Sequence, residues 1–238
     1  MVQILVSLYF NTKYEDMKKL IDYNPFEDLT NKDVQYWLGW LASDGCVVGN
    51  RISLSVQRKD RDILEKLNNF LNNKLNIYDG VYHKYKDFEY SKLSFRDTET
   101  AKFLNTLGIT QNKTKNLEIK FPLTWSFVRG FFEGDGCLYI HQKRPRIQFT
   151  CASSNFVNQL RNFFDANNIK LSVTKVIRGK SIHYQMSISY LEGVYRFLDN
   201  IYSTANIFLN RKYCNARAIR NNSWKAVKLG ELAVRIPS

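Results

Sequence analysis

The sequence has few of the features typical of secreted or membrane-spanning proteins. Its 238 residues include only 4 cysteines, which form no Cys-x-x-Cys pair and have no histidine at zinc-ligand spacing. This pattern argues against a disulfide framework and a structural zinc site, and it favours an intracellular protein. No run approaches the roughly 18 apolar residues that a membrane-spanning helix needs. The apolar residues 1–10 lack the basic start and small-residue cleavage site of a secretory signal.

Acidic residues are also scarce relative to basic ones. The chain carries 22 Asp and Glu against 35 Lys and Arg, which gives a net charge of +13 at pH 7. Such a surplus attracts polyanions, of which nucleic acids and acidic membrane surfaces are the common cellular examples. Binding to a membrane surface would require an amphipathic basic helix, which the sequence lacks. With 44% hydrophobic residues, the chain can build a full core.

One sequence pattern occurs twice. The segment WLGWLASDGC at residues 37–46 is matched by VRGFFEGDGC at residues 128–137. Each copy is followed by an alternating strand, an amphipathic helix, two strand-like runs and a second helix. These elements are expected at residues 51–57, 63–71, 77–85, 90–95 and 101–107, and again at 146–152, 156–164, 171–177, 182–189 and 194–201. The sequence therefore predicts an α+β fold made by tandem duplication of an αββαββα unit.

The repeat also predicts the domain organisation. An N-terminal extension, residues 1–33, precedes the first half at residues 34–109, and a polar linker at 110–122 leads to the second half at 123–203. Residues 204–238 form a C-terminal tail with a single acid, Glu231. Its basic residues are Arg211, Lys212, Arg217, Arg220, Lys225, Lys228 and Arg235. We expect this tail to add positive charge to the surface that binds the polyanion.

Both motif segments place small residues four positions apart within a bulky apolar helix. Gly39 is followed by Ser43, and Gly130 is followed by Gly134. Small residues at this spacing let two helix backbones approach closely. We therefore expect the two motif helices to pack on each other through Gly39 and Gly130.

Each motif helix should end at an aspartate, Asp44 or Asp135, followed by a glycine in the left-handed conformation that closes many helices. A carboxylate at this end opposes the helix dipole at a cost of about 0.3–1 kcal/mol, and helix pairing would bring the two acids together. We expect them to bind Mg²⁺ or Mn²⁺ with the carbonyls of Ser43 and Gly134. Because such a metal can activate water and stabilise a leaving oxygen, the pattern indicates a nuclease.

These two segments resemble the motifs of the LAGLIDADG homing endonucleases, in the single-chain form with two copies. Residues 130–136 match the family pattern more closely than the first copy, which has bulky opening residues and Ala42 in place of an acid. The resemblance implies that Asp44 and Asp135 bind the catalytic metal. It also implies a monomer that makes double-strand breaks in a long pseudo-palindromic or asymmetric DNA target, with two saddle-shaped antiparallel sheets in the major groove.

The family resemblance leaves alternatives open. A non-cleaving DNA- or RNA-binding protein and an intron maturase could use the same scaffold, although such proteins often lose one motif acid and this chain has both. The resemblance favours an intron-encoded or free-standing protein over one embedded in an intein. We expect it in a bacterial or phage-infected cytoplasm or in an organelle.

The alternating strands predict which side chains face the DNA. Apolar residues such as Leu54 and Phe149 should pack on the helices, which leaves polar side chains on the open face to contact bases and phosphates. The expected DNA contacts are Arg51, Ser53, Ser55, Gln57, Lys84, Lys86, Lys92, Ser94, Arg96, His141, Lys143, Arg146, Gln148, Thr150, Arg178, Lys180, His183, Gln185 and Ser187. The aromatic residues follow the apolar pattern, so we assign them no stacking role.

Other polar side chains usually surround the scissile phosphates in this family. By resemblance, Gln57 and Arg96 occupy those places in the first half and are candidate catalytic residues, whereas the second half has Ala152 and Tyr190 there. Glu133 has no acidic counterpart in the first motif, so we expect it to be solvated or structural.

Overall fold

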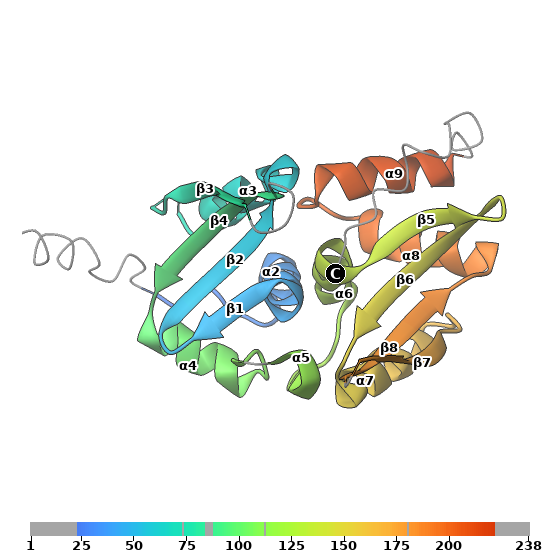
Figure 1. The fold of residues 1–238 in the computed structure, drawn as a ribbon, viewed down its shortest axis with the longest axis horizontal. Coiled ribbons are helices and arrows are strands. Elements are labelled where there is room, and N and C mark those ends of the chain that lie inside the picture. Colours follow the sequence, from blue (N-terminus) through green and yellow to red (C-terminus); the bar gives the residue numbers. More distant parts are fainter. Residues whose placement is uncertain (1–22, 73, 84–87, 112, 180, 222–238) are drawn as a thin grey trace, which may run out of the picture.

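The computed structural model describes residues 23–221 except 73, 84–87, 112 and 180 (Figure 1). The first half contains α2 (Lys32–Ser43), β1 (Gly45–Val48), β2 (Arg51–Gln57), the 3-10 turn η1 (Arg58–Asp60), α3 (Asp62–Phe70), β3 (Ile77–Tyr82), β4 (Phe88–Arg96) and α4 (Thr98–Thr106). The second half repeats this order with α6 (Trp125–Asp135), β5 (Cys137–His141), β6 (Arg144–Cys151), α7 (Ser154–Ala166), β7 (Ser172–Arg178), β8 (Ser181–Ile188) and α8 (Leu191–Tyr202). The predicted duplication of an αββαββα unit is confirmed.

Each half has one four-stranded antiparallel sheet. The strand order is β1-β2-β4-β3 in the first sheet and β5-β6-β8-β7 in the second. The predicted alternation holds, because Leu54 pairs with Leu93 and Phe149 pairs with Met186, and all four side chains are buried. In each half the helices pack on this apolar side of the sheet. The opposite side of each sheet is left open.

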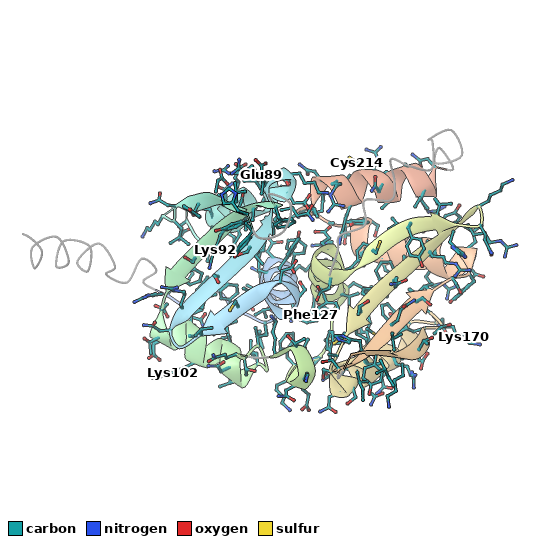
Figure 2. The ribbon with its side chains drawn as sticks, in the orientation of Figure 1. Glu89, Lys92, Lys102, Phe127, Lys170 and Cys214 are labelled. Atoms are coloured by element: carbon teal, nitrogen blue, oxygen red, sulfur yellow. The ribbon has the colours of Figure 1, made fainter. Side chains whose placement is uncertain are left out.

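Helices α2 and α6 lie side by side at the centre of the molecule, between the two sheets (Figure 1). Figure 2 shows Phe127 of α6 at this junction. Aromatic residues fill the core around α6: the Phe132 ring centroid lies 5.7 Å from that of Phe149 and 5.1 Å from that of Phe197. The two halves therefore share one hydrophobic core through the paired helices.

Side-chain caps begin both central helices. The Asn31 carboxamide oxygen accepts from the Asp33 N–H at 2.8 Å, and the Thr124 hydroxyl accepts from the Phe127 N–H at 3.2 Å. Such caps satisfy N–H groups that have no partner within the helix. They fix the starting points of the two helices.

Two short helices lie outside the predicted repeat. Helix α5 (Lys113–Asn116) is part of the predicted linker, and α9 (Asn210–Arg220) is part of the predicted C-terminal tail. In Figure 1, α5 and α9 lie at opposite ends of the junction between the halves. None of the helices in the described ranges is long and apolar enough to span a membrane.

Candidate metal centre and nucleic-acid interface

The two central helices touch backbone to backbone. A methyl group at Gly39 would lie 2.1 Å from the Phe127 carbonyl oxygen, and one at Gly130 would lie 2.0 Å from the Tyr36 carbonyl oxygen. Further along, a methyl group at Gly134 would lie 2.0 Å from the Ser43 hydroxyl oxygen. A larger residue at Gly39 or Gly130 would meet backbone atoms and force the helices apart. The small residues therefore set the distance between the two helix ends.

The glycines after the two motif acids do not adopt the left-handed conformation that we expected. Gly136 is extended, with φ −82° and ψ 156°, and Gly45 is absent from the described residues with positive φ. Their lack of a side chain serves a different purpose. A methyl group would lie 2.5 Å from the Leu41 carbonyl oxygen at Gly45, and 2.2 Å from the Phe132 ring at Gly136. Glycine lets the chain fold back closely against the last helical turn.

The motif acids lie at the paired ends of α2 and α6. Asp44 closes α2 through its N–H, which donates to the Trp40 carbonyl at 3.1 Å, and Asp135 is the last residue of α6. The Asp44 carboxylate reaches toward the other helix: its Oδ2 would lie 3.1 Å from a methyl group at Gly134. Both acids remain exposed on one side, although protein surrounds them on the others. The two carboxylates thus lie close enough at the paired helix ends for the charge of one to act on the other.

This crowding makes the carboxylates hard to ionise. Burial raises the pKa of Asp44, and the charges of Lys212 and Lys113 partly offset that rise. Burial and the charge of Asp44 raise the pKa of Asp135 to about 7, again against the two lysines. A carboxylate pair that is unfavourable in this way is typical of a functional site. A bound cation would relieve it.

The two lysines near the acids were not predicted from the sequence. Lys113, in α5, donates to the Gly45 carbonyl, directly after Asp44. Lys212, in α9, donates to the carbonyls of Phe132 at 2.7 Å and Gly136 at 2.6 Å, on either side of Asp135. Burial lowers the pKa of Lys212 to about 8. The only feature of the sequence that could have predicted their place near the acids is that each lysine follows the last helix of its half.

The donor set at the helix ends suits a hard divalent cation. No group of three or more His, Cys, Asp or Glu able to hold a metal occurs in the described part of the chain. A cation would depend on two carboxylates, backbone oxygens, water and phosphate, an arrangement that Mg²⁺ accepts because it retains several waters. The Gly134 carbonyl already accepts weakly from Lys212, at 3.4 Å. Asp44 and Asp135 are therefore the principal candidate ligands, with Ser43 and Gly134 as backbone candidates.

Most predicted DNA-contacting side chains lie on the open sides of the two sheets. In the first sheet Ser55 pairs with Lys92, and Figure 2 shows Lys92 on this sheet. In the second, Gln148 accepts hydrogen bonds from Gln185 at 3.2 Å and from Tyr139 at 3.1 Å. Solvent reaches Arg51, Ser55, Gln57, Lys92, Ser94, Arg96, His141, Lys143, Arg146, Gln148, Thr150, His183, Gln185 and Ser187.

Several expected contacts need correction or lie outside the described residues. Ser53 points to the open side, but its neighbours cover it to 5% exposure, so it is not free to contact DNA. Lys84, Lys86 and Lys180 are outside the described residues, as is the side chain of Arg178.

The structure separates the two predicted accessory catalytic residues. Asp44 precedes Gly45, which pairs with Leu54 of β2, so Gln57 lies toward the acid-bearing end of that strand. Arg96 pairs with Arg51 at the other end of β2, about 20 Å from Gln57 at roughly 3.3 Å per residue. The two residues therefore lie at opposite ends of β2, and Arg96 is an exposed residue of the open side whose accessory role stays a prediction.

Three tyrosines were wrongly expected to follow the apolar pattern. Tyr78 and Tyr82 of β3 are 63% and 57% exposed, and the Tyr82 ring stacks on Tyr90 of β4 with centroids 4.5 Å apart. Tyr90 pairs with Gly80, where a methyl group would lie 2.5 Å from the Tyr90 ring. The open side of the first sheet therefore ends in an aromatic surface.

Glu133 takes one of the two expected roles, whereas the C-terminal tail differs from expectation. Glu133 is 2% exposed and accepts hydrogen bonds from the Tyr36 hydroxyl and the Leu209 N–H, so it is structural and not solvated. In the tail, Lys212 is buried and Arg211 forms an ion pair with Asp60. These two basic side chains therefore make their contacts within the protein. Residues 222–238 of the tail are outside the described residues.

Known structures share this fold. The chain is 16% identical to the full-length WhiA of Thermatoga maritima, with 92% of this chain and 68% of that one covered at a TM-score of 0.53. The homing endonuclease I-WcaI bound to its DNA recognition sequence is 13% identical to this chain. The match covers 79% of this chain and 85% of I-WcaI, with a TM-score of 0.53. I-DmoI in complex with DNA and Ca is 12% identical to this chain. The match covers 84% of this chain and 100% of I-DmoI, with a TM-score of 0.53. Identities this low show the fold alone.

Sequence comparison identifies the family. None of the curated protein sequences matches the chain significantly. The model of the LAGLIDADG-like domain matches twice, at residues 31–108 and 123–202. Each match contains one of the central helices and the sheet that follows it. Because the two matches cover more than half of the sequence, the chain belongs to the LAGLIDADG family, with two copies of the domain in one polypeptide.

Proposed function

We propose that this protein is a site-specific homing endonuclease that makes double-strand breaks in a long DNA target. The observation that carries the proposal is the convergence of Asp44 and Asp135 at the paired helix ends, where burial raises the pKa of both. The structures of I-WcaI and I-DmoI, each bound to DNA, support DNA as the substrate. The identities of 12% and 13% to these endonucleases show the fold alone, so the likeness by itself does not distinguish cleavage from binding.

The residues at the helix ends provide complementary chemistry. Asp44 and Asp135, with the Ser43 and Gly134 carbonyls, would hold Mg²⁺ or Mn²⁺. Such a metal activates an attacking water and stabilises the oxygen that leaves. The complex of I-DmoI with DNA and Ca supports a divalent ion in this fold. The charge of Lys113 lowers the pKa of both acids and could balance charge on a scissile phosphate, although burial lowers the pKa of Lys113 itself.

The open sides of the two sheets would hold the DNA. Their polar side chains, with Lys92 and Arg146 among them, are of the types that contact phosphates and base edges. The net charge of +13 favours such binding. The second sheet presents Gln148, Gln185 and Thr150, whereas the first ends in tyrosines, so we expect an asymmetric target read by a monomer.

A selection experiment tests this proposal. The full chain is incubated with a randomised duplex library and Mg²⁺, and the cleaved molecules are sequenced. We expect one long motif to be enriched, with both strands cut, and no cleavage when EDTA replaces Mg²⁺. Enrichment of bound but uncut DNA would instead favour the alternative, a DNA-binding protein without nuclease activity. Binding to RNA in preference to duplex DNA would favour a maturase.

A further inference from the structure

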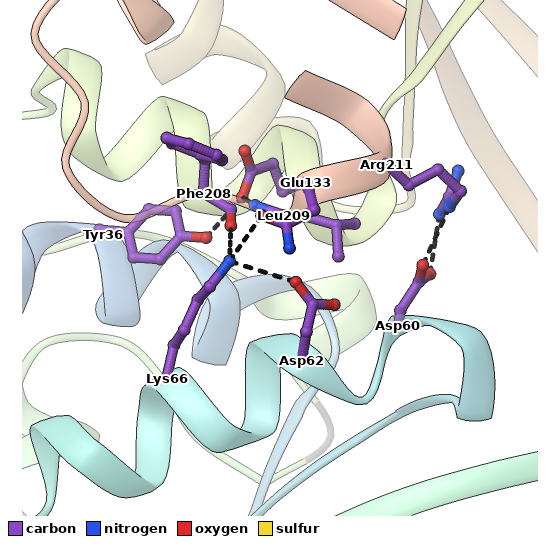
Figure 3. Close-up of polar contacts among 9 residues, drawn as sticks. Tyr36, Asp60, Asp62, Lys66, Glu133, Phe208, Leu209 and Arg211 are labelled. Carbon is purple, nitrogen blue, oxygen red and sulfur yellow. Dashed lines mark hydrogen bonds and ion pairs between the residues drawn. The ribbon is translucent and has the colours of Figure 1, made fainter. Parts of the chain in front are cut away.

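The C-terminal segment crosses the junction between the two halves. The family match ends at residue 202, and α9 begins at Asn210. In Figure 1 this helix runs along the top of the second half and begins beside α3 of the first. Figure 3 shows its opening residues surrounded by side chains from both halves. The segment is thus a part of the fold, outside the duplicated units.

The first half holds the start of α9 through two polar residues, Asp60 and Lys66. Asp60 accepts from Arg211 Nε at 2.9 Å and from Nη2 at 2.8 Å, a bidentate pair in which Asp60 is only 5% exposed. Lys66 donates to the Phe208 carbonyl at 2.6 Å and to the Asn210 side chain at 2.9 Å. Bidentate Arg–carboxylate pairs fix orientation as well as distance. Asp60 therefore holds Arg211 in one orientation.

The second half holds the same segment through Glu133. This buried carboxylate, from α6, accepts from the Leu209 N–H at 2.8 Å and from the Tyr36 hydroxyl of α2 (Figure 3). The backbone just before α9 is thereby attached to the paired central helices. The start of α9 is held from both halves at once.

Lys212, the residue after Arg211, is directed at the acid site. Its ammonium donates to the carbonyls that flank Asp135, and its side chain is 5% exposed. Adjacent residues of one helix turn thus contact different halves: Arg211 contacts η1, and Lys212 contacts the end of α6. We infer that the Asp60–Arg211 pair positions the Lys212 ammonium against the carbonyls that flank Asp135, so that a contact of the first half fixes the backbone at the motif acid of the second half.

The opposite side of the molecule has a matching arrangement. Gln159 of α7 donates to the Ile119 carbonyl at 2.7 Å and accepts from its N–H at 2.9 Å, while the Ser153 hydroxyl donates to the Leu117 carbonyl at 2.6 Å. This linker segment follows α5, which carries Lys113. In each case a segment that leaves one half is held by the other half and carries a lysine to the acid pair. The repeated arrangement argues against a chance surface contact.

The test compares two arginines of the same helix. Arg211→Lys keeps the charge and loses the bidentate geometry, and Arg211→Met removes both. The matched controls are Arg220→Lys and Arg220→Met, because Arg220 forms a bidentate pair with Asp199 that is about half exposed and distant from the acids. Circular dichroism shows whether each variant is folded. If Arg211→Met does not fold, Arg211→Lys carries the test.

The first measurement does not depend on cleavage. Brief acetylation of the native full chain, followed by mass spectrometry, reports the accessibility of Lys212 against the exposed Lys102. We expect Lys212 to be protected in the wild type and in the Arg220 variants, and labelled severalfold faster in the Arg211 variants. Equal protection of Lys212 in all folded variants would overturn the inference.

The second measurement rests on the proposed function. Strand-resolved cleavage should show one strand cut roughly 10- to 100-fold more slowly in the Arg211 variants, because a small misplacement of a catalytic group has effects of this size. DNA affinity and cleavage of the other strand should be little changed. Equal slowing of both strands would indicate a general structural role and would contradict the inference. If the wild type cuts no DNA, the proposed function fails while the acetylation result still decides the position of Lys212.

Discussion

Gly130 lies so close to Tyr36 that a single added methyl group would come within 2.0 Å of the Tyr36 carbonyl oxygen. This contact joins the two central helices at the point where their backbones cross. Because Asp44 and Asp135 lie at the ends of these same helices, the helix spacing determines whether the two carboxylates can share one cation. The packing of small residues and the chemistry of the site are thus parts of one arrangement.

Gly130→Ala should weaken the pairing of the halves. The methyl group meets backbone atoms that cannot rotate away, and overpacking of this kind typically costs about 1–3 kcal/mol. The measurement is the free energy of unfolding from urea denaturation. Gly179→Ala is the control, because its added methyl group meets nothing within 4 Å and its φ of +59° costs only backbone strain. If Gly130→Ala lowered the free energy of unfolding by less than Gly179→Ala does, the close approach of α2 and α6 at Gly130 would be contradicted.

Metal-free stability should depend on the ionisation of Asp135. Its pKa is raised to about 7 in the folded protein from an ordinary value of 3.8, so between these pH values the folded state binds a proton that the unfolded chain has lost. The stability from this group is therefore lost as pH rises from about 4 toward 7. In EDTA, the melting temperature of the wild type relative to that of Asp135→Asn should fall as pH rises from about 4 to about 7. Added Mg²⁺ should raise the melting temperature of the wild type most strongly at the upper end of this pH range. A melting-temperature difference between wild type and Asp135→Asn that does not change with pH would argue against the raised pKa.

Lys113 should set the pH range of cleavage. Its positive charge lowers the pKa of both acids, so Lys113→Gln should move the rising limb of the pH–rate profile to higher pH and reduce the rate near neutral pH. Lys113→Arg keeps the charge and should leave the profile near its wild-type position. The measurement is the single-turnover cleavage rate from about pH 6 to pH 9. Identical profiles for the Gln variant and wild type would remove Lys113 from the site.

The open side of the second sheet should provide base recognition. Gln185→Ala removes a side chain that donates to Gln148, and loss of one good base contact typically costs about 1–3 kcal/mol of discrimination. Binding to the selected target and to random DNA should show a loss confined to the former. Lys102→Ala, on α4, is the control and should change neither affinity by much. Unchanged specificity for the Gln185 variant would place the DNA elsewhere.

The repeat made the fold and the acid pair predictable from sequence. Asp44 and Asp135 occupy equivalent places in two copies, and the period-two alternation around Leu54 and Phe149 identified the buried side of each sheet. Both signals are local, because they depend on spacing within a few residues. The same spacing correctly identified Gly39 and Gly130 as close contacts between the helices.

The remaining features depend on contacts between distant parts of the chain. Lys113 lies in a polar run without periodicity, and Lys212 meets the carbonyl of Phe132, which is 80 positions away in the sequence. The shielding of Ser53 and the separation of Arg96 from Gln57 follow from strand register, which the sequence alone did not fix. Glycine after each acid suggested a left-handed turn, yet here it prevents a clash with the preceding helical turn.

Cleavage by the two aspartate variants tests the account most directly. Asp44→Asn and Asp135→Asn preserve shape but remove one carboxylate each, so the pair can no longer hold the divalent cation. The measurement is cleavage of both strands of the selected target with Mg²⁺, alongside binding to the same DNA in Ca²⁺. We predict that neither variant makes double-strand breaks while both bind the target within a fewfold of wild type. Double-strand cleavage at the wild-type rate by either variant would contradict the assignment of these acids as the catalytic site.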